Sequence, residues 1–170
     1  MEHRGPEYGS VNQRQQFVAT ASRLLDEHDH LVLLLGDISV YAFRDAMARH
    51  PKRVLNMGCA EQATVGFAAG LALNGFYPVF HTIDPFVARR CYEQVYLDFG
   101  HQRLGGLFVT VGHDRDYRNL GPSHHGDHCA ALMRTVPGMR VVEPVSVLEV
   151  ETEMSIAVQA RDLAYVRLRA

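Results

Sequence analysis

Continuous apolar runs that alternate with helical patterns constrain the fold of this chain more than any other feature. The runs 31–35 and 106–112 are apolar along almost their whole length, and glycine marks the end of each. Strands buried on both faces of a sheet have this composition, whereas half-exposed strands alternate between apolar and polar residues. Because helical patterns separate the runs, the sequence predicts an α/β fold, a three-layer sandwich with a mainly parallel sheet.

The predicted elements follow one another without a linker or an internal repeat. We expect strands at 31–35, 54–57, 77–81, 106–112, 140–143 and 164–168, and helices at 13–28, 41–49, from Glu61 onward, at 86–99, 127–135 and 147–159. Residues 1–10 are polar and contain glycine and proline, which predicts a flexible lead-in before a single domain over residues 11–170.

The loops that follow predicted strands hold most of the chemically interesting side chains. They are expected at residues 36–37, 58–61, 81–86 and 113–125. Because the carboxyl ends of parallel strands share one edge of a sheet, we expect these loops to converge there.

The overall composition excludes several classes of function. The chain has 170 residues, of which 47% are hydrophobic and 21% charged, and its net charge is −2. Without a basic run, nucleic-acid binding is not expected. The longest apolar run, Leu31–Leu35, is too short to span a bilayer, and the N-terminus lacks the apolar core of a signal peptide. Cys59, Cys91 and Cys129 are isolated, so we expect reduced thiols and a cytoplasmic protein.

One histidine cluster was weighed as a metal site. His124, His125 and His128 could ligate zinc, but no set of cysteines or carboxylates accompanies them, and we expect no metal bound by this chain. The absence of a GxGxxG or P-loop motif weakens a nucleotide-binding interpretation of the α/β pattern.

Glu61 lies between a predicted strand and a predicted helix with almost no other charge nearby. The helix dipole favours the ionised carboxylate, whereas apolar surroundings favour the neutral acid. A carboxylate under these opposed influences can share a proton with a nitrogen atom of a ligand. Read locally, the pattern also fits a structural role, in which Glu61 caps the helix and Gly66 and Gly70 allow close helix packing.

Four stretches in order resemble the central domain of transketolases and 1-deoxyxylulose-5-phosphate synthases. They are Gly58-Cys59-Ala60-Glu61-Gln62 with the glycine-rich 66–75, then Phe86 through Tyr92-Glu93-Gln94-Val95, Gly121-Pro122-Ser123-His124-His125, and Pro137 through Pro144. The resemblance runs from about Gln13 to Arg169 and implies the pyrimidine-binding fold for thiamine diphosphate.

The resemblance assigns the cofactor residues. It makes Glu61 the catalytic carboxylate that holds a proton at N1′ of the cofactor's aminopyrimidine ring. It makes Phe86 the aromatic platform beneath that ring, although a core position at a helix start is the alternative. Ile83 stands in the pocket where the family often has an aromatic residue.

The resemblance also implies substrate contacts. His124 matches a catalytic histidine near the reacting carbonyl, where it could donate a hydrogen bond or move a proton. His113, Arg14 and Arg169 resemble residues that contact a substrate phosphate. Three departures put an ordinary sugar phosphate in doubt: Leu120 replaces an aspartate that recognises a hydroxyl, Ile83 replaces an aromatic residue, and Arg89 replaces another.

The chain carries only half of the family's cofactor site. The Gly-Asp-Gly motif that holds Mg²⁺ and the diphosphate is missing. The resemblance therefore implies a split enzyme, in which a separate diphosphate-binding subunit binds Mg²⁺ and pairs with this chain in an α2β2 assembly. The expected reaction is two-carbon ketol or acyl transfer. The alternatives are a split 2-oxo acid decarboxylase or dehydrogenase and a non-catalytic scaffold.

Overall fold

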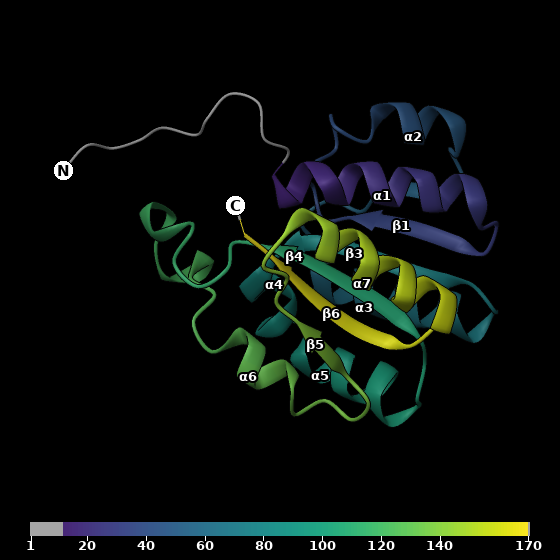
Figure 1. The fold of residues 1–170 in the computed structure, drawn as a ribbon. Coiled ribbons are helices and arrows are strands. Elements are labelled where there is room, and N and C mark those ends of the chain that lie inside the picture. Colours follow the sequence, from purple (N-terminus) through teal and green to yellow (C-terminus); the bar gives the residue numbers. More distant parts are fainter. Residues whose placement is uncertain (1–11, 170) are drawn as a thin grey trace, which may run out of the picture.

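The computed structural model describes residues 12–169, so the lead-in expected at 1–10 lies outside the described residues (Figure 1). These residues form a six-stranded sheet in the order β2-β1-β3-β4-β6-β5, in which all neighbouring strands are parallel. The strands are β1 (Leu31–Leu35), β2 (Val54–Asn56), β3 (Tyr77–Ile83), β4 (Gly106–Val111), β5 (Arg140–Val142) and β6 (Leu163–Leu168).

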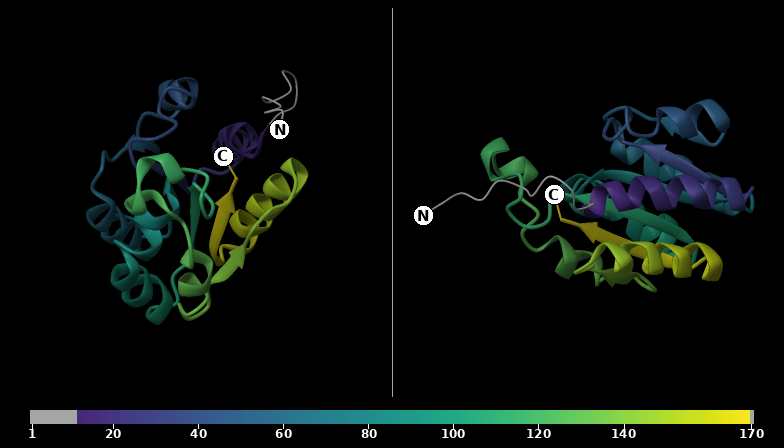
Figure 2. Two further views of the ribbon diagram at one scale, coloured as in Figure 1. Left: turned by 90° about the vertical axis from the view of Figure 1, so that its left-hand side faces the viewer. Right: turned by 45° about the horizontal axis from the view of Figure 1, so that its top comes forward.

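Helices cover both faces of the sheet (Figures 1 and 2). One layer contains α1 (Gln13–Glu27), α2 (Arg44–Arg49) and α7 (Val147–Ala160), with α1 and α7 side by side. The other contains α3 (Glu61–Leu73), α4 (Asp84–Ala88), α5 (Tyr92–Gln94), the π-helix η1 (Val95–His101) and α6 (Cys129–Met133). The predicted three-layer α/β sandwich is confirmed.

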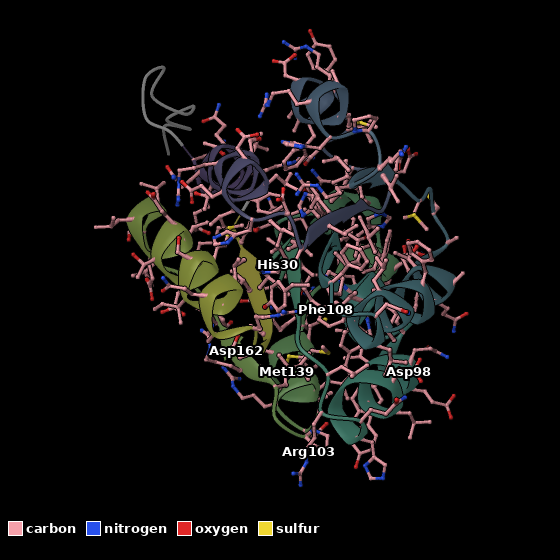
Figure 3. The ribbon with its side chains drawn as sticks, turned by 90° about the vertical axis from the view of Figure 1, so that its right-hand side faces the viewer. His30, Asp98, Arg103, Phe108, Met139 and Asp162 are labelled. Carbon is pink, nitrogen blue, oxygen red and sulfur yellow. The ribbon has the colours of Figure 1, made fainter. Side chains whose placement is uncertain are left out.

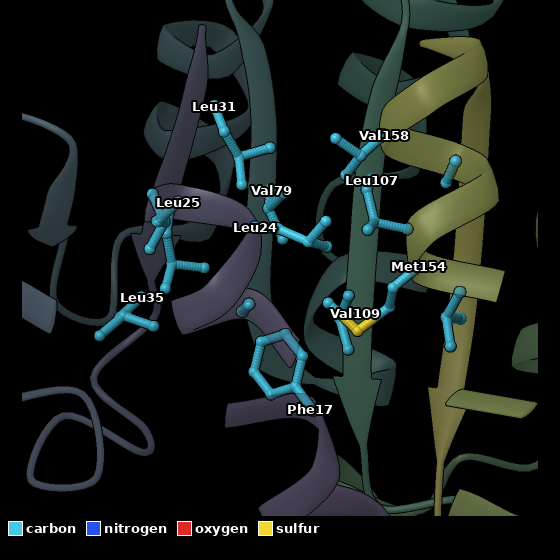
Figure 4. Packing of buried hydrophobic residues seen from close by; sticks show 14 of the residues in the cluster. Phe17, Leu24, Leu25, Leu31, Leu35, Val79, Leu107, Val109, Met154 and Val158 are labelled. Carbon is cyan, nitrogen blue, oxygen red and sulfur yellow. The ribbon is translucent and has the colours of Figure 1, made fainter. Parts of the chain in front are cut away.

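Alternate residues of each strand enter the two cores. In β1, Leu31, Leu33 and Leu35 pack toward α1 and α7, whereas Val32 and Leu34 pack toward α3. Figure 4 shows the first of these cores, where the side chains of the two helices meet those of β3 and β4. Each large aliphatic side chain buried in this way contributes about 1.5–3 kcal/mol, which explains why the strands tolerate so few polar residues.

Local sequence signals fix where the two long helices begin. Asn12 and Gln15 form a capping box at the start of α1, in which each side chain accepts a hydrogen bond from the backbone N–H of the other. Ser146 accepts a hydrogen bond from the backbone N–H of Glu149 at the start of α7. Both caps lie at the carboxyl edge of the sheet, so these helices run antiparallel to the strands.

The continuous helix predicted over residues 86–99 is broken in the structure between α4 and α5. Two hydrogen bonds draw the backbone away from regular helix: the Cys91 thiol donates to the carbonyl of Phe86, and the Gln62 side chain donates to the carbonyl of Arg90. The helix predicted at 127–135 is also shorter, because His128 adopts a left-handed backbone conformation (φ 65°) immediately before α6. Both differences lie next to the residues of chemical interest.

The amino-terminal edge of the strands faces the viewer in Figure 3, where Asp162 lies before β6 and Arg103 extends outward. Arg140 pairs there with Asp162, at 2.8 Å between Nε and Oδ2, and with Glu153. The loops expected at 36–37, 58–61, 81–86 and 113–125 lie at the opposite edge.

Candidate active site at the carboxyl edge of the sheet

The predicted loops converge at the carboxyl edge, on the left-hand side of Figure 1. Hydrogen bonds join the segments directly: the N–H of Gly36 donates to the carbonyl of His81, and the N–H of Met57 donates to the carbonyl of Leu35. The segment 112–128 adds two 3-10 turns, η2 (Arg118–Leu120) and η3 (Pro122–His124).

Glu61 is the first residue of α3 and is only 5% exposed. Ala60, immediately before it, provides no side-chain cap, and the Glu61 carboxylate faces Arg90 instead. Nη1 of Arg90 lies 3.4 Å from each carboxylate oxygen. An open hollow of about 440 Å³ adjoins this pair and is lined by Cys59, Ala60, Glu61, Gln62, Ala63 and Arg90. The carboxylate is thus sheltered, yet a ligand can approach it.

Phe86 and His124 lie on the other side of Arg90. The guanidinium carbon of Arg90 is 3.4 Å from the centroid of the Phe86 ring. Phe86 also contacts His124, whose ring centroid is 5.0 Å away at an interplanar angle of 64°. The structure therefore brings Glu61, Phe86 and His124, which are far apart in the sequence, into one continuous group through Arg90.

The residues that depart from the family pattern differ in location. Ile83 is 8% exposed and belongs to the core that α1 covers, so it supports the carboxyl edge from inside the protein. Leu120 is 59% exposed on the loop that carries His124. Arg89 donates hydrogen bonds to the carbonyls of Pro122 (3.2 Å) and His125 (2.6 Å), and thereby holds that loop against α4.

His113 is buried between two carboxylates. Its Nδ1 lies 3.0 Å from Asp114 and its Nε2 lies 3.0 Å from Glu143. Burial acts to raise the pKa of Glu143, but hydrogen bonds from Arg134 and His113 and the charge of Arg167 outweigh it, and the pKa is lowered. Two carboxylates and two arginines therefore surround His113, and both of its ring nitrogens face carboxylates of this chain.

A buried ion pair between Asp84 and Arg167 was missed in the sequence. Their side chains are 1% and 2% exposed, and Nη2 of Arg167 lies 2.8 Å from Oδ2 of Asp84. Asp84 also accepts hydrogen bonds from Thr110 and Tyr165. The signal was present, because an arginine in the middle of an otherwise apolar strand requires a buried partner.

Arg167 links the parts of the edge that carry the candidate residues. Besides Asp84, at the start of the helix that carries Phe86, it donates to the carbonyl of Gly126 (3.0 Å), two residues after His124. It also pairs with Glu143, the partner of His113. One guanidinium therefore connects α4, the 113–128 segment and the end of β5.

Arg14 is the first member of a hydrogen-bonded chain that reaches the core. Its Nε donates to Oγ of Ser39 (2.9 Å), and Oγ lies 2.9 Å from Nε2 of His81. Nδ1 of His81 faces the carbonyl of Val109, which can only accept, so Nδ1 carries the proton and Nε2 accepts from Ser39. Burial lowers the pKa of His81 to about 3, so this histidine is neutral.

The turn that carries Ser39 is strained. Asp37 and Ser39 have φ of 58° and 57°, in the left-handed region that disfavours residues with a side chain. The Arg14 side chain and this turn line a pocket of about 410 Å³. Arg169 is exposed at the end of β6, and its N–H donates to the side chain of Gln13, which places it beside the start of α1.

Residues 12–169 contain neither a metal-binding group of side chains nor a helix that could span a membrane. No group of three or more His, Cys, Asp or Glu side chains is arranged to hold a metal ion, and the histidines at 124, 125 and 128 form no such group. None of the helices within this range combines the length and the apolar character needed to cross a membrane.

Comparison with known proteins places this architecture in a family. Residues 10–169 match the family described as transketolase, pyrimidine binding domain. An uncharacterized 33.6 kDa protein from the fasciation locus of Rhodococcoides fascians is 34% identical over 128 residues, covering 75% of this chain and 41% of that protein. The 1-deoxy-D-xylulose-5-phosphate synthase 2 of Geobacter sulfurreducens is 33% identical over 162 residues, covering 94% of this chain and 25% of the synthase.

Solved structures agree with the sequence matches. A split gene transketolase, described as an inactive beta4 tetramer, is 27% identical with a TM-score of 0.82, and the match covers 95% of this chain and 52% of that one. Transketolase from Campylobacter jejuni, at 14% identity and a TM-score of 0.83, shares the fold; the match covers 96% of this chain and 27% of that one.

The fold and the family match together define a pyrimidine-binding α/β domain. The chain belongs to the transketolase family, as the sequence motifs predicted, and it spans less than half the length of the two curated relatives described above.

Proposed function

We propose that this chain is a subunit of a split, thiamine-diphosphate-dependent transketolase-like enzyme that transfers a two-carbon ketol or acyl unit. The observation that carries this proposal is the sheltered Glu61 carboxylate, which adjoins an open hollow and is joined to the face of Phe86 through the Arg90 guanidinium. A flat aromatic face and a carboxylate able to hold a proton are what an aminopyrimidine ring requires, so these residues fit the cofactor.

Each candidate residue then has a role. Bound thiamine diphosphate supplies a centre that adds to a carbonyl group and stabilises the negative charge that develops on carbon. Glu61 holds a proton at N1′ of the pyrimidine, and Phe86 orients the ring by stacking. His124, which contacts Phe86, donates to the substrate oxygen that becomes negative. Ile83 supports the pocket from the core.

The substrate end of the site is proposed at the start of α1. Arg14, held by Ser39, and the exposed Arg169 are placed to bind an anionic group of the donor. We assign His113 to the same substrate region. Its partners Asp114 and Glu143 are carboxylates that accept hydrogen bonds, so they favour a substrate group that donates them. With Leu120 unable to bond a hydroxyl, the donor differs from the usual sugar phosphates.

The missing half of the cofactor site is assigned to a partner subunit, which binds Mg²⁺ and the diphosphate. The surface of α3 supports such an association: Phe67 is 44% and Leu73 63% exposed. A Cβ atom at Gly66 or Gly70 would meet no atom of residues 12–169 beyond the adjoining backbone of α3 within 4 Å, so the small residues there leave room for another molecule. We propose an α2β2 heterotetramer in the cytoplasm; the split transketolase neighbour, described as a beta4 tetramer, supports an assembly of four subunits.

A split 2-oxo acid decarboxylase or dehydrogenase is the second candidate, favoured by the absence of a hydroxyl-binding aspartate at Leu120. Donor turnover by the complex of this chain with the diphosphate-binding subunit separates the two. Ketose cleavage without release of carbon dioxide supports transfer, and release of carbon dioxide supports decarboxylation.

The test of the site is Glu61→Gln in the same complex. The variant keeps the shape of the side chain but cannot hold the proton, so we expect the rate to fall by about 10²–10⁴. Glu27→Gln, at an exposed glutamate at the end of α1 and away from this edge, is the matched control and should leave the rate unchanged. A Glu61→Gln complex with near-normal turnover would refute the assignment of Glu61.

A further inference from the structure

Arg90 occupies the space between the two residues assigned to the pyrimidine ring. Its guanidinium carbon lies 3.4 Å from the centroid of the Phe86 ring, and its Nη1 lies 3.4 Å from both oxygens of Glu61. A guanidinium is planar, stacks on aromatic faces and donates N–H groups to carboxylates. A protonated aminopyrimidine has the same three properties.

We propose that Arg90 is a displaceable occupant of the pyrimidine half-site, which neutralises Glu61 and covers Phe86 until the cofactor's ring replaces it. This inference rests on the proposed function, because it takes Glu61 and Phe86 as the residues that receive the ring. It adds to that function that the Arg90 side chain competes with the pyrimidine ring, so that cofactor binding requires this side chain to leave.

The contacts of Arg90 are suited to release. Its side chain is 44% exposed, so water can solvate the guanidinium as soon as it turns outward. The 3.4 Å separation from Glu61 is long for a charged hydrogen bond, which is usually about 2.7–2.9 Å. The backbone is fixed independently, because the carbonyl of Arg90 accepts a hydrogen bond from Gln62 (2.8 Å). The side chain can therefore move while the residue stays in place.

The competition predicts a measurable effect on affinity. A ligand that binds only the open state has its affinity reduced by the fraction of molecules in that state. Because the Arg90 side chain is 44% exposed, we assign its pair with Glu61 about 1 kcal/mol, which corresponds to about a fivefold change in an equilibrium constant. Removing the Arg90 side chain should therefore tighten binding of the pyrimidine ring by about fivefold.

The first measurement is the NMR signal of the Arg90 Nε–H group in the full chain. If the guanidinium lies over Phe86, ring current shifts this signal upfield, and Phe86→Leu abolishes the shift. A signal at the ordinary arginine position in the free chain overturns the proposal, whatever the chain binds.

The second measurement is a titration with thiamine, which carries the pyrimidine without the diphosphate. The backbone amides of the first turn of α3 report binding in the millimolar range, so a weak half-site is still detected. We compare the wild type with Arg90→Ala and with Arg103→Ala, an exposed arginine at the opposite edge of the sheet. Tighter binding by Arg90→Ala alone supports the proposal.

The other outcomes separate two failures. Equal binding by wild type and Arg90→Ala at the α3 amides leaves the pyrimidine site intact and overturns the role of Arg90. If the amides do not change in any variant, thiamine does not bind at the start of α3. The proposed pyrimidine site is then wrong, and so is the inference that rests on it.

Discussion

Two arginine–carboxylate pairs flank the short helix α4, and they differ in almost every physical respect. At its start, Asp84 and Arg167 are nearly inaccessible to solvent and are joined at 2.8 Å. Just beyond its end, Arg90 approaches Glu61 only to 3.4 Å and is 44% exposed. The first pair has further hydrogen bonds to Thr110, Tyr165 and Gly126, whereas the Arg90 guanidinium rests on the face of Phe86.

The comparison shows how similar chemical groups serve different purposes. A buried charge that loses its partner is left without water, so a pair such as Asp84 and Arg167 cannot open while the protein is folded. In the second pair Glu61 is sheltered but Arg90 is 44% exposed, so water can solvate the guanidinium when it leaves and the pair contributes less. The first pair belongs to the framework that positions α4, and the second pair lies where the proposed ligand must enter.

The largest expected effect comes from breaking the buried pair. Asp84→Ala removes the buried partner of Arg167, which keeps Glu143 and Asp114, and leaves Thr110 and Tyr165 without their acceptor. We expect the free energy of unfolding to fall by about 3 kcal/mol, measured by urea denaturation. The matched control is Glu27→Ala, which breaks a pair with Arg23 that is just as short (2.7 Å) but exposed, and should change stability by less than about 0.5 kcal/mol. Similar losses in both variants would contradict the importance of burial.

A smaller effect tests another buried polar group, His81. Its pKa of about 3 lies below the value of 6.5 for free histidine, so the unfolded chain takes up a proton as pH falls and the folded chain does not. The stabilisation is therefore complete above pH 6.5 and declines as pH falls toward 3, by about 2 kcal/mol between pH 7 and pH 5.

Thermal or urea unfolding at several pH values measures this slope. His81→Asn retains a donor for the Val109 carbonyl but does not titrate, so its stability should vary less over the same range. Parallel profiles for the two proteins between pH 7 and pH 5 would show that His81 is not locked in its neutral form.

The smallest effect on stability is expected at the pair of Arg90 and Glu61. Arg90→Ala should change the free energy of unfolding by less than about 1 kcal/mol in the same urea assay, because its partner Glu61 adjoins an open hollow and lies at a helix N-terminus. A loss comparable to that of Asp84→Ala would erase the distinction between the two pairs and make Arg90 a structural residue.

The sheet and its order of elements could be predicted because apolar strands report burial on both faces. The broken helix could not, because a thiol and a glutamine side chain compete for the carbonyls of Phe86 and Arg90. The motifs selected Glu61, Phe86 and His124, and the structure places them together. The role of Arg90 could not be predicted from the sequence, because only its side-chain conformation shows that the guanidinium lies over the Phe86 ring.

The strained turn after β1 has a consequence for engineering. Glycine at Asp37 or at Ser39 would relieve the backbone, because left-handed φ values of 58° and 57° disfavour residues with a side chain. The two substitutions would not be equivalent for the catalyst. Glycine at position 39 removes the hydroxyl that joins Arg14 to His81, so the buried Nε2 of His81 loses its donor and the relief of backbone strain is offset. The same change loosens the arginine at the proposed substrate entrance.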